Sequence, residues 1–181
     1  NTNWKFLIEN FIEPYHVQFV HKTTTNQPLK DHYTIVDGIC YGSGVDVKQE
    51  DNKNSNALSV SSRYLSLFPN FIIGTYYPNQ IGVYLNIPIS PSVTSQKRII
   101  YTTNGKVMTK EESDLAKKIW WSVHKEDHEI CERLQEGRAS PASNEGGLLS
   151  PYWEKGVQAF QKLIIQETMK SSKLMKGKKN V

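Results

Sequence analysis

Apolar residues recur at three- and four-residue spacings along the first part of the chain. The positions are Phe6, Leu7, Phe11, Ile12, Tyr15, Phe19 and Val20. This spacing is typical of a helix that packs one face against a core. Pro14 lies within the pattern, and proline breaks a regular helix because it lacks a backbone N–H and clashes with the preceding turn. We therefore predict, over residues 4–21, a helix that breaks or loosens near Pro14.

Between residues 33 and 101 the pattern changes to that of β-strands. Tyr, Ile, Val and Ser alternate there, and glycines and prolines interrupt the runs. Alternation with a period of two, bounded by turn residues, predicts several antiparallel strands. The strand candidates are residues 57–68, 71–76, 82–89 and 97–103. The polar, Asn-rich stretch 49–56 predicts a surface loop.

A long amphipathic helix is predicted after the strands. Thr109 and Glu112 have the spacing of a capping box, which opens a helix, and Gly137 supplies its end. Its apolar stripe consists of Leu115, Ile119, Val123, Ile130 and Leu134.

A second helix opens at Ser150 and Pro151, after a flexible-looking connection over residues 140–149. Its apolar stripe consists of Trp153, Val157, Phe160 and Ile164. The layout predicts an α+β fold, in which long helices pack on one face of an antiparallel sheet.

Composition limits the class of protein. A chain of 181 residues, 38% of them hydrophobic, is long enough for one compact domain. No run of about 20 apolar residues occurs, and the first residues lack the apolar core of a secretory signal. Cys40 and Cys131 are the only cysteines, too few for a disulfide framework or a four-cysteine metal site. We expect a soluble cytoplasmic protein without a membrane segment.

The net charge of +4 comes from the C-terminal end. Five lysines lie within the last twelve residues: Lys170, Lys173, Lys176, Lys178 and Lys179. Without them the chain is close to neutral, and no basic stripe interleaved with aromatic residues occurs elsewhere, so we expect no nucleic-acid partner. We predict a domain over residues 1–168 and a basic, disordered tail over 169–181.

Two histidines near the start of the chain are candidate metal ligands. His16 and His21 lie five residues apart, and Glu13 precedes His16 by three. Neutral imidazoles suit Fe, Zn and Cu. On an ideal helix the two side chains would point about 140° apart, so both reach one ion only where the helix ends or loosens. The pair alone leaves packing or a solvated face open as alternatives.

Asp127 falls on the apolar stripe of the long helix, four residues after Val123 and three before Ile130. A lone buried carboxylate costs several kcal/mol unless it is paired or coordinates a metal. Asp127 therefore needs a cationic partner, either a metal ion or a Lys or Arg at the edge of the core. Glu126 points about 100° away around the helix and is the weaker ligand candidate.

Two histidines and one carboxylate form the ligand set of non-haem Fe(II) oxygenases, which leaves coordination positions open for oxygen. A structural zinc site would close its fourth position with another protein ligand. Iron is favoured over zinc, and a hydrolytic zinc site stays open as an alternative.

Several segments of the chain resemble one known family. They are NWK at 3–5, ENFIEPYHVQFVH at 9–21, YLSLFPN at 64–70, EDHEICERLQEG at 126–137, GLLSP at 147–151 and Glu154. In this combination and order they resemble the catalytic domain of the α subunits of Rieske-type, aromatic-ring-hydroxylating oxygenases. The resemblance covers roughly residues 1–166.

The resemblance implies a helix-grip fold, with iron held by His16, His21 and Asp127 at the mouth of a buried substrate pocket. It assigns Glu13, an aspartate in most relatives, to a bridge that carries electrons from a Rieske cluster on a neighbouring subunit. Asn10 and Tyr15 are further candidates beside the ligands. For these two, a hydrogen bond at a helix terminus and ordinary packing are the respective alternatives.

Family members also carry a Cys-x-His and a Cys-x-x-His pair that hold a [2Fe–2S] cluster. This chain contains neither, so we expect either a truncated α subunit or one that uses the cluster of another polypeptide.

The expected activity is O2-dependent mono- or dioxygenation of a small organic, preferably aromatic, substrate at Fe(II). Electrons would come from NAD(P)H through a reductase or ferredoxin and the Rieske cluster, in a homo-oligomer that is trimeric by analogy. Pocket walls from residues 23–31 and the strands would suit either an aromatic ring or a quaternary amine caged by aromatics. The strand residues concerned are Tyr64, Phe68, Tyr84 and Asn86. The alternatives are a metal-free helix-grip module that binds a hydrophobic ligand, and a zinc hydrolase.

Overall fold

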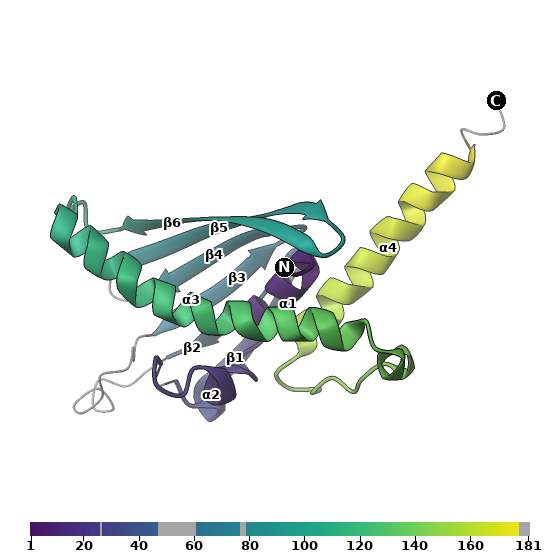
Figure 1. Ribbon diagram of the computed structural model, residues 1–181, viewed down its shortest axis with the longest axis horizontal. Coiled ribbons are helices and arrows are strands. Elements are labelled where there is room, and N and C mark those ends of the chain that lie inside the picture. Colours follow the sequence, from purple (N-terminus) through teal and green to yellow (C-terminus); the bar gives the residue numbers. More distant parts are fainter. Residues whose placement is uncertain (26, 47–60, 77–78, 178–181) are drawn as a thin grey trace.

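The computed structural model describes residues 1–25, 27–46, 61–76 and 79–177. Its centre is a six-stranded antiparallel sheet in which each strand pairs with its neighbours in sequence (Figure 1). The strands are β1 (His32–Asp37), β2 (Cys40–Val45), β3 (Ser62–Leu67), β4 (Phe71–Tyr76), β5 (Gln80–Ser90) and β6 (Val93–Thr102). The prediction of an α+β fold built on an antiparallel sheet is confirmed.

The observed strands match the alternating pattern closely. β4 has the predicted bounds, β5 begins two residues earlier than the predicted 82, and β6 begins at Val93 rather than at 97. β3 lies within the candidate 57–68, whose first four residues are outside the described part of the chain, as is the predicted loop 49–56. β1 and β2 fall where the pattern indicated strands without defining their bounds.

The N-terminal segment forms two helices separated by the break that Pro14 predicted. Helix α1 spans Trp4–Ile12 and the single turn α2 spans Val17–Val20. Asn3 caps α1, since its side-chain oxygen accepts a hydrogen bond from the backbone N–H of Lys5 at 3.0 Å. The break places residues 13–16 at the turn between the helices, so both histidines lie beside α2 rather than inside a long helix.

Helix α3 spans Lys110–Arg138 and opens with the predicted capping box of Thr109 and Glu112. It crosses the sheet in front of the strands (Figure 1). Its inward face differs from the prediction, because the buried residues are Trp120, Val123 and Cys131. Members of the predicted stripe are exposed instead: Leu115 at 60%, Ile119 at 37% and Leu134 at 39%.

The physical reason is the contact that Trp120 makes with the sheet. An indole buries more apolar area than a leucine or isoleucine, and Trp120 packs its ring 4.2 Å from that of Tyr76 on β4. The helix is therefore rotated toward Trp120 relative to the predicted stripe. Asp127 stays near the inward side of α3 despite this rotation, and its side chain is 18% exposed.

Helix α4 spans Lys155–Gly177 and begins five residues after Ser150, the predicted opening. The 3-10 turn η3 (Pro141–Glu145) lies in the predicted connection. Val157 and Phe160 of α4 join Ile8 and Ile12 of α1 in the main hydrophobic core, which also contains Tyr41, Ile72 and Tyr84 of the sheet.

Beyond this core, α4 projects away from the sheet (Figure 1). It continues to Gly177, into the basic segment that was expected to be a disordered tail, and residues 178–181 lie outside the described part. Among the described helices, none has the length and apolar character that crossing a membrane requires.

Candidate metal centre

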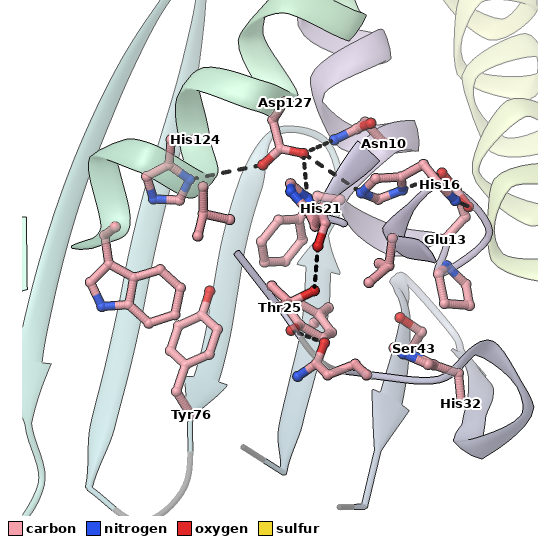
Figure 2. Close-up of a pocket in the computed structure, with 17 residues that line it drawn as sticks. Asn10, Glu13, His16, His21, Thr25, His32, Ser43, Tyr76, His124 and Asp127 are labelled. Carbon is pink, nitrogen blue, oxygen red and sulfur yellow. Dashed lines mark hydrogen bonds and ion pairs between the residues drawn. The ribbon is translucent and has the colours of Figure 1, made fainter. Parts of the chain in front are cut away.

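The backbone around α2 turns two histidines toward one point. His16 directly precedes the four-residue helix and His21 directly follows it, where φ of −92° and ψ of 40° end the helical turn. The helical turn thus stops just before His21, which is what both histidines need in order to reach one ion. The two imidazole rings lie 5.3 Å apart, and α3 faces them with Asp127 (Figure 2).

The ligand atoms of these three side chains converge. Nε2 of His21 lies 3.1 Å from Oδ1 of Asp127, and Nε2 of His16 lies 3.6 Å from the same oxygen. One ligand atom from each residue lies within 4.8 Å of the other two. Two nitrogen donors and one oxygen donor on one side of a shared point could hold a divalent ion of the first transition series.

A carboxylate holds the outer nitrogen of each histidine. Nδ1 of His16 lies 2.6 Å from Oε1 of Glu13, and Nδ1 of His21 lies 2.7 Å from Oε2 of Glu126. A proton on Nδ1 that points to a carboxylate leaves the lone pair of Nε2 free for a metal. The arrangement therefore fixes both rings in the orientation and tautomer that metal binding needs.

Neutral side chains complete the surroundings of the carboxylates. Nδ2 of Asn10 donates to Oδ1 of Asp127 at 2.9 Å, and the Thr24 hydroxyl donates to Oε2 of Glu126 at 2.6 Å. Asn10 is thus engaged with Asp127 rather than with a helix terminus. Glu126, the weaker ligand candidate in the sequence, lies behind a histidine.

The charges of Asp127 and His21 stabilise each other. Burial works to raise the pKa of Asp127, but the hydrogen bond and charge of His21, together with His16, outweigh burial and lower it. Burial works to lower the pKa of His21, but Asp127 and Glu126 outweigh it and raise that pKa. Without a metal, protonated imidazoles supply the positive charge beside Asp127, and a bound cation would take over that role.

Tyr15 is the one predicted site residue whose side chain the fold keeps out of this cluster. Its ring is 45% exposed and contacts Phe19 and Trp153, which is the packing alternative. Its backbone N–H nevertheless reaches the site, because it donates to Oε2 of Glu13.

The sequence interpretation missed two histidines near the site. Nδ1 of His124 lies 3.9 Å from Oδ2 of Asp127, and its position three residues earlier on the helix could have indicated this. His32 is 2% exposed, and burial lowers its pKa to about 4. No periodic pattern pointed to His32, because it lies at the start of a strand whose bounds the sequence did not define.

A small aromatic cavity lies beside the histidines (Figure 2). Its volume is about 50 Å³, and its walls include Phe11, Tyr64, Tyr76 and Trp120. The rings of Tyr64 and Tyr76 lie 6.0 Å apart. Since one water needs roughly 10–15 Å³ of such space, this inner cavity has room for a group of a few heavy atoms. The cavity confirms that Tyr64 lines a pocket, whereas Phe68 packs against the main hydrophobic core.

Comparison with known proteins identifies the family. Residues 1–170 match the model of the ring hydroxylating alpha subunit (catalytic domain). The chain belongs to this family. The prediction of a Rieske-type non-haem iron oxygenase domain is therefore confirmed at the level of the family.

Two similar curated relatives are chloroplastic choline monooxygenases. The protein of Atriplex hortensis is 28% identical over 160 residues, which are 88% of this chain and 36% of that protein. The protein of Spinacia oleracea is 25% identical over 174 residues, 93% of this chain and 38% of its own length. The chain thus spans little more than a third of these relatives. Since they are chloroplastic, the expected cytoplasmic location stays a prediction.

Solved structures share the fold. The quaternary ammonium Rieske monooxygenase CntA in complex with an inhibitor has a TM-score of 0.70 at 20% identity, covering 91% of this chain and 45% of that one. The 2-oxoquinoline 8-monooxygenase component has a TM-score of 0.51 at 12% identity, covering 82% and 43%. The family match and these structures support the helix-grip arrangement expected for the sheet and helices.

Proposed function

We propose that this domain is the oxygen-activating part of a Rieske-type monooxygenase that acts on a quaternary ammonium compound. Fe(II) would be held by His16, His21 and Asp127. The observation that carries the proposal is the convergence of their ligand atoms within 4.8 Å beside an aromatic cavity. Fe(II) fits this donor set, which supplies two neutral nitrogens and one anionic oxygen.

Each residue has a distinct part in this arrangement. His16 and His21 act as neutral donors through Nε2, while Glu13 and Glu126 keep their Nδ1 protons in place. Asp127 supplies the anionic donor. Iron bound by two histidines and one carboxylate supplies open coordination positions for O2.

The wall of the inner cavity favours a cationic group. Tyr76 and Trp120 pack against each other with ring centroids 4.2 Å apart, Tyr64 adjoins Tyr76, and all three rings line the cavity. Aromatic faces attract a quaternary ammonium through their quadrupole, by about 0.5–2 kcal/mol per ring contact. The similar proteins named for choline and for quaternary ammonium compounds point the same way. An aromatic-ring substrate, the first expectation, stays an untested prediction.

Electrons would come from NAD(P)H through a reductase or ferredoxin and a Rieske [2Fe–2S] cluster on another domain or subunit. Glu13 lies where such a cluster could approach, because it is next to exposed aromatic residues: Tyr15 donates its backbone N–H to Glu13, and its ring contacts that of Phe19. Tyr15 is 45% exposed and Phe19 56% exposed. An apolar surface beside a carboxylate that holds an iron ligand suits the docking of a Rieske domain. The neighbouring subunit of a homo-oligomer, trimeric by analogy, would provide it.

The test combines metal content with turnover. Protein prepared anaerobically with Fe(II) should contain about one iron per chain, and it should oxygenate choline or γ-butyrobetaine when a Rieske partner and reductase are added. Replacing His16, His21 or Asp127 with Ala should each remove most of the iron. His128→Ala is the matched control, because this histidine on α3 has a 57% exposed side chain and lies outside the cluster.

Other outcomes would redirect the assignment. Full iron and activity in Asp127→Ala would refute the ligand set, and Glu126 would then be tested as the ligand. Bound zinc with activity that needs no reductant would indicate a zinc hydrolase. Ligand binding without any metal would indicate a helix-grip binding module. Turnover of an aromatic acid but of no quaternary ammonium compound would refute the proposed substrate class.

A further inference from the structure

A second, larger cavity adjoins the inner one. It has a volume of about 770 Å³ and lies between α3 and β6. Trp120 and His124 line both cavities, so these two side chains form the wall between them. We call the larger cavity the α3–β6 groove. A ligand that extends past this wall from the inner cavity would enter the groove.

Arg98 lies in this groove without a counter-ion. Across the β5–β6 pair it is opposite Tyr84, and its guanidinium carbon lies 5.2 Å from the centre of the Tyr84 ring. Nε donates to the side-chain oxygen of Gln96, but Nη1 is buried and has no hydrogen-bond partner in the described part of the chain. None of the ion pairs found among the described residues includes Arg98.

A second arginine in the same sheet shows what a satisfied site of this kind looks like. The guanidinium of Arg63 lies 5.3 Å from the centre of the Tyr33 ring, and its Nη2 pairs with Asp46 at 2.8 Å. The two arginines thus have the same cation–π arrangement, but among the described residues only Arg63 also has a carboxylate partner. A guanidinium stays charged in proteins, and a partly buried charge without a partner is costly.

Asp127 does not take this role. Its charge acts on Arg98 only through space, since no ion pair joins the two residues. Its Oδ1 already accepts from Asn10 and faces both metal-binding histidines. The groove contains another buried nitrogen without a partner, Nε2 of His124. Two nitrogen groups that lack partners and line one cavity fit an oxygen anion.

We propose that the α3–β6 groove binds a carboxylate carried by the substrate, and that Arg98 determines specificity for it. This inference rests on the proposed function: the quaternary ammonium end would occupy the inner aromatic cavity, and the carboxylate end would pair with Arg98. A substrate with only a cationic end would leave Arg98 unpaired and add a second positive charge near it. A zwitterion neutralises both ends, and a planar carboxylate can accept two hydrogen bonds from one guanidinium.

The test is binding under argon to the iron-loaded protein, measured by calorimetry without turnover. The probes are γ-butyrobetaine and its methyl ester, which has the same cationic end but no anionic charge. The unaltered protein should bind γ-butyrobetaine at least tenfold more tightly than the ester. Arg98→Met should remove this difference and leave the affinity for the ester within about twofold, since the charge-assisted pair is lost. Lys97→Met is the matched control, because Lys97 is exposed and points from the opposite face of β6.

Equal affinities for the two probes in the unaltered protein would overturn the proposal, and so would an equal loss of both in Arg98→Met. If Arg98→Met does not fold, Arg98→Lys keeps the charge but not the planar fork, and it should still weaken γ-butyrobetaine binding selectively. If neither quaternary probe binds, the proposed substrate class fails, and butyrate alone then tests the groove. Butyrate binding that depends on Arg98 would support the anion site, and no butyrate binding would refute it.

Discussion

Nδ1 of His21 lies 2.7 Å from Oε2 of Glu126. The residue directly before Asp127 therefore holds one of the histidines that face Asp127. Adjacent positions on a helix point about 100° apart. Asp127 therefore lies beside the Nε2 atoms of both histidines, while Glu126 reaches Nδ1 of His21 on the far side of the ring. Two consecutive carboxylates of α3 thus contact the two nitrogens of one imidazole: Asp127 faces Nε2 of His21, and Glu126 holds Nδ1.

This relationship predicts the effect of replacing Glu126. In Glu126→Ala, the Nδ1–H of His21 and the Thr24 hydroxyl lose the carboxylate oxygen that accepts from both. We expect iron affinity to fall by about 10–100-fold, the range for lost outer partners of metal ligands. Competition with a chelator measures it. Glu129→Ala is the control, since that side chain is 58% exposed, and a complete loss of iron in Glu126→Ala would make Glu126 a ligand.

The second prediction concerns Glu13, which accepts from three donors within its own chain. Oε1 faces Nδ1 of His16, and Oε2 accepts from the backbone N–H groups of Tyr15 and His16. In Glu13→Gln the amide oxygen can still accept from Nδ1 of His16 and hold that ring, although the amide nitrogen cannot accept from the two backbone N–H groups. Iron content and substrate binding should therefore stay nearly unchanged. The lost charge should slow electron delivery, and turnover with the Rieske partner should fall tenfold or more, about 1.4 kcal/mol in barrier.

Peroxide-driven turnover provides the control for Glu13, because peroxide bypasses the cluster. It should fall much less than turnover with the Rieske partner and reductase. Equal losses by the two routes would show that Glu13 shapes the iron site itself, and the bridging role would be withdrawn.

Local rules account for the parts of the fold that the sequence could predict. Pro14 ends α1, and Thr109 with Glu112 opens α3, because each effect depends on residues within one turn. β4 has its predicted bounds, since alternation and the flanking turn residues define a strand locally. The separation of His16 and His21 by a single turn likewise follows from the break at Pro14.

The rest depended on contacts between distant segments. The rotation of α3 is set by the packing of Trp120 against Tyr76. The spacing of leucines and isoleucines along the helix does not reveal that contact. The placement of Glu126 behind His21 arises only once α2 lies against α3. Arg98 was not singled out, because its missing counter-ion becomes visible only when the surroundings of β6 are known.

The third prediction concerns Cys131, which is 1% exposed on the inner face of α3. Burial, followed by the charge of Asp127, raises the pKa of its thiol to about 12. The reactive thiolate is therefore scarce at pH 8. Iodoacetamide should label the partly exposed Cys40 first and Cys131 only after unfolding in urea, as mass spectrometry of peptides would show. Equal labelling of both cysteines in the folded protein would contradict the buried position of α3 at this residue.

The last prediction concerns acid stability. Burial lowers the pKa of His32 from 6.5 to about 4, so the folded protein keeps this ring neutral while the unfolded chain takes up a proton. Between pH 6.5 and 4 the unfolded state thus binds more protons, and stability falls as the pH falls. At most, His32 accounts for about 3 kcal/mol of this loss. His32→Gln does not titrate, so its unfolding free energy should change less from pH 7 to pH 4 than that of the unaltered protein.

Urea unfolding of the iron-free protein at several pH values measures this difference, with iron removed so that acid does not also strip the metal. His21 titrates in both proteins and cancels in the comparison, although its raised pKa acts in the opposite direction. His128→Gln serves as the exposed control and should follow the unaltered protein. Parallel curves for His32→Gln and the unaltered protein would mean that the folded state protonates His32 near its ordinary pKa, and that the ring is reached by water.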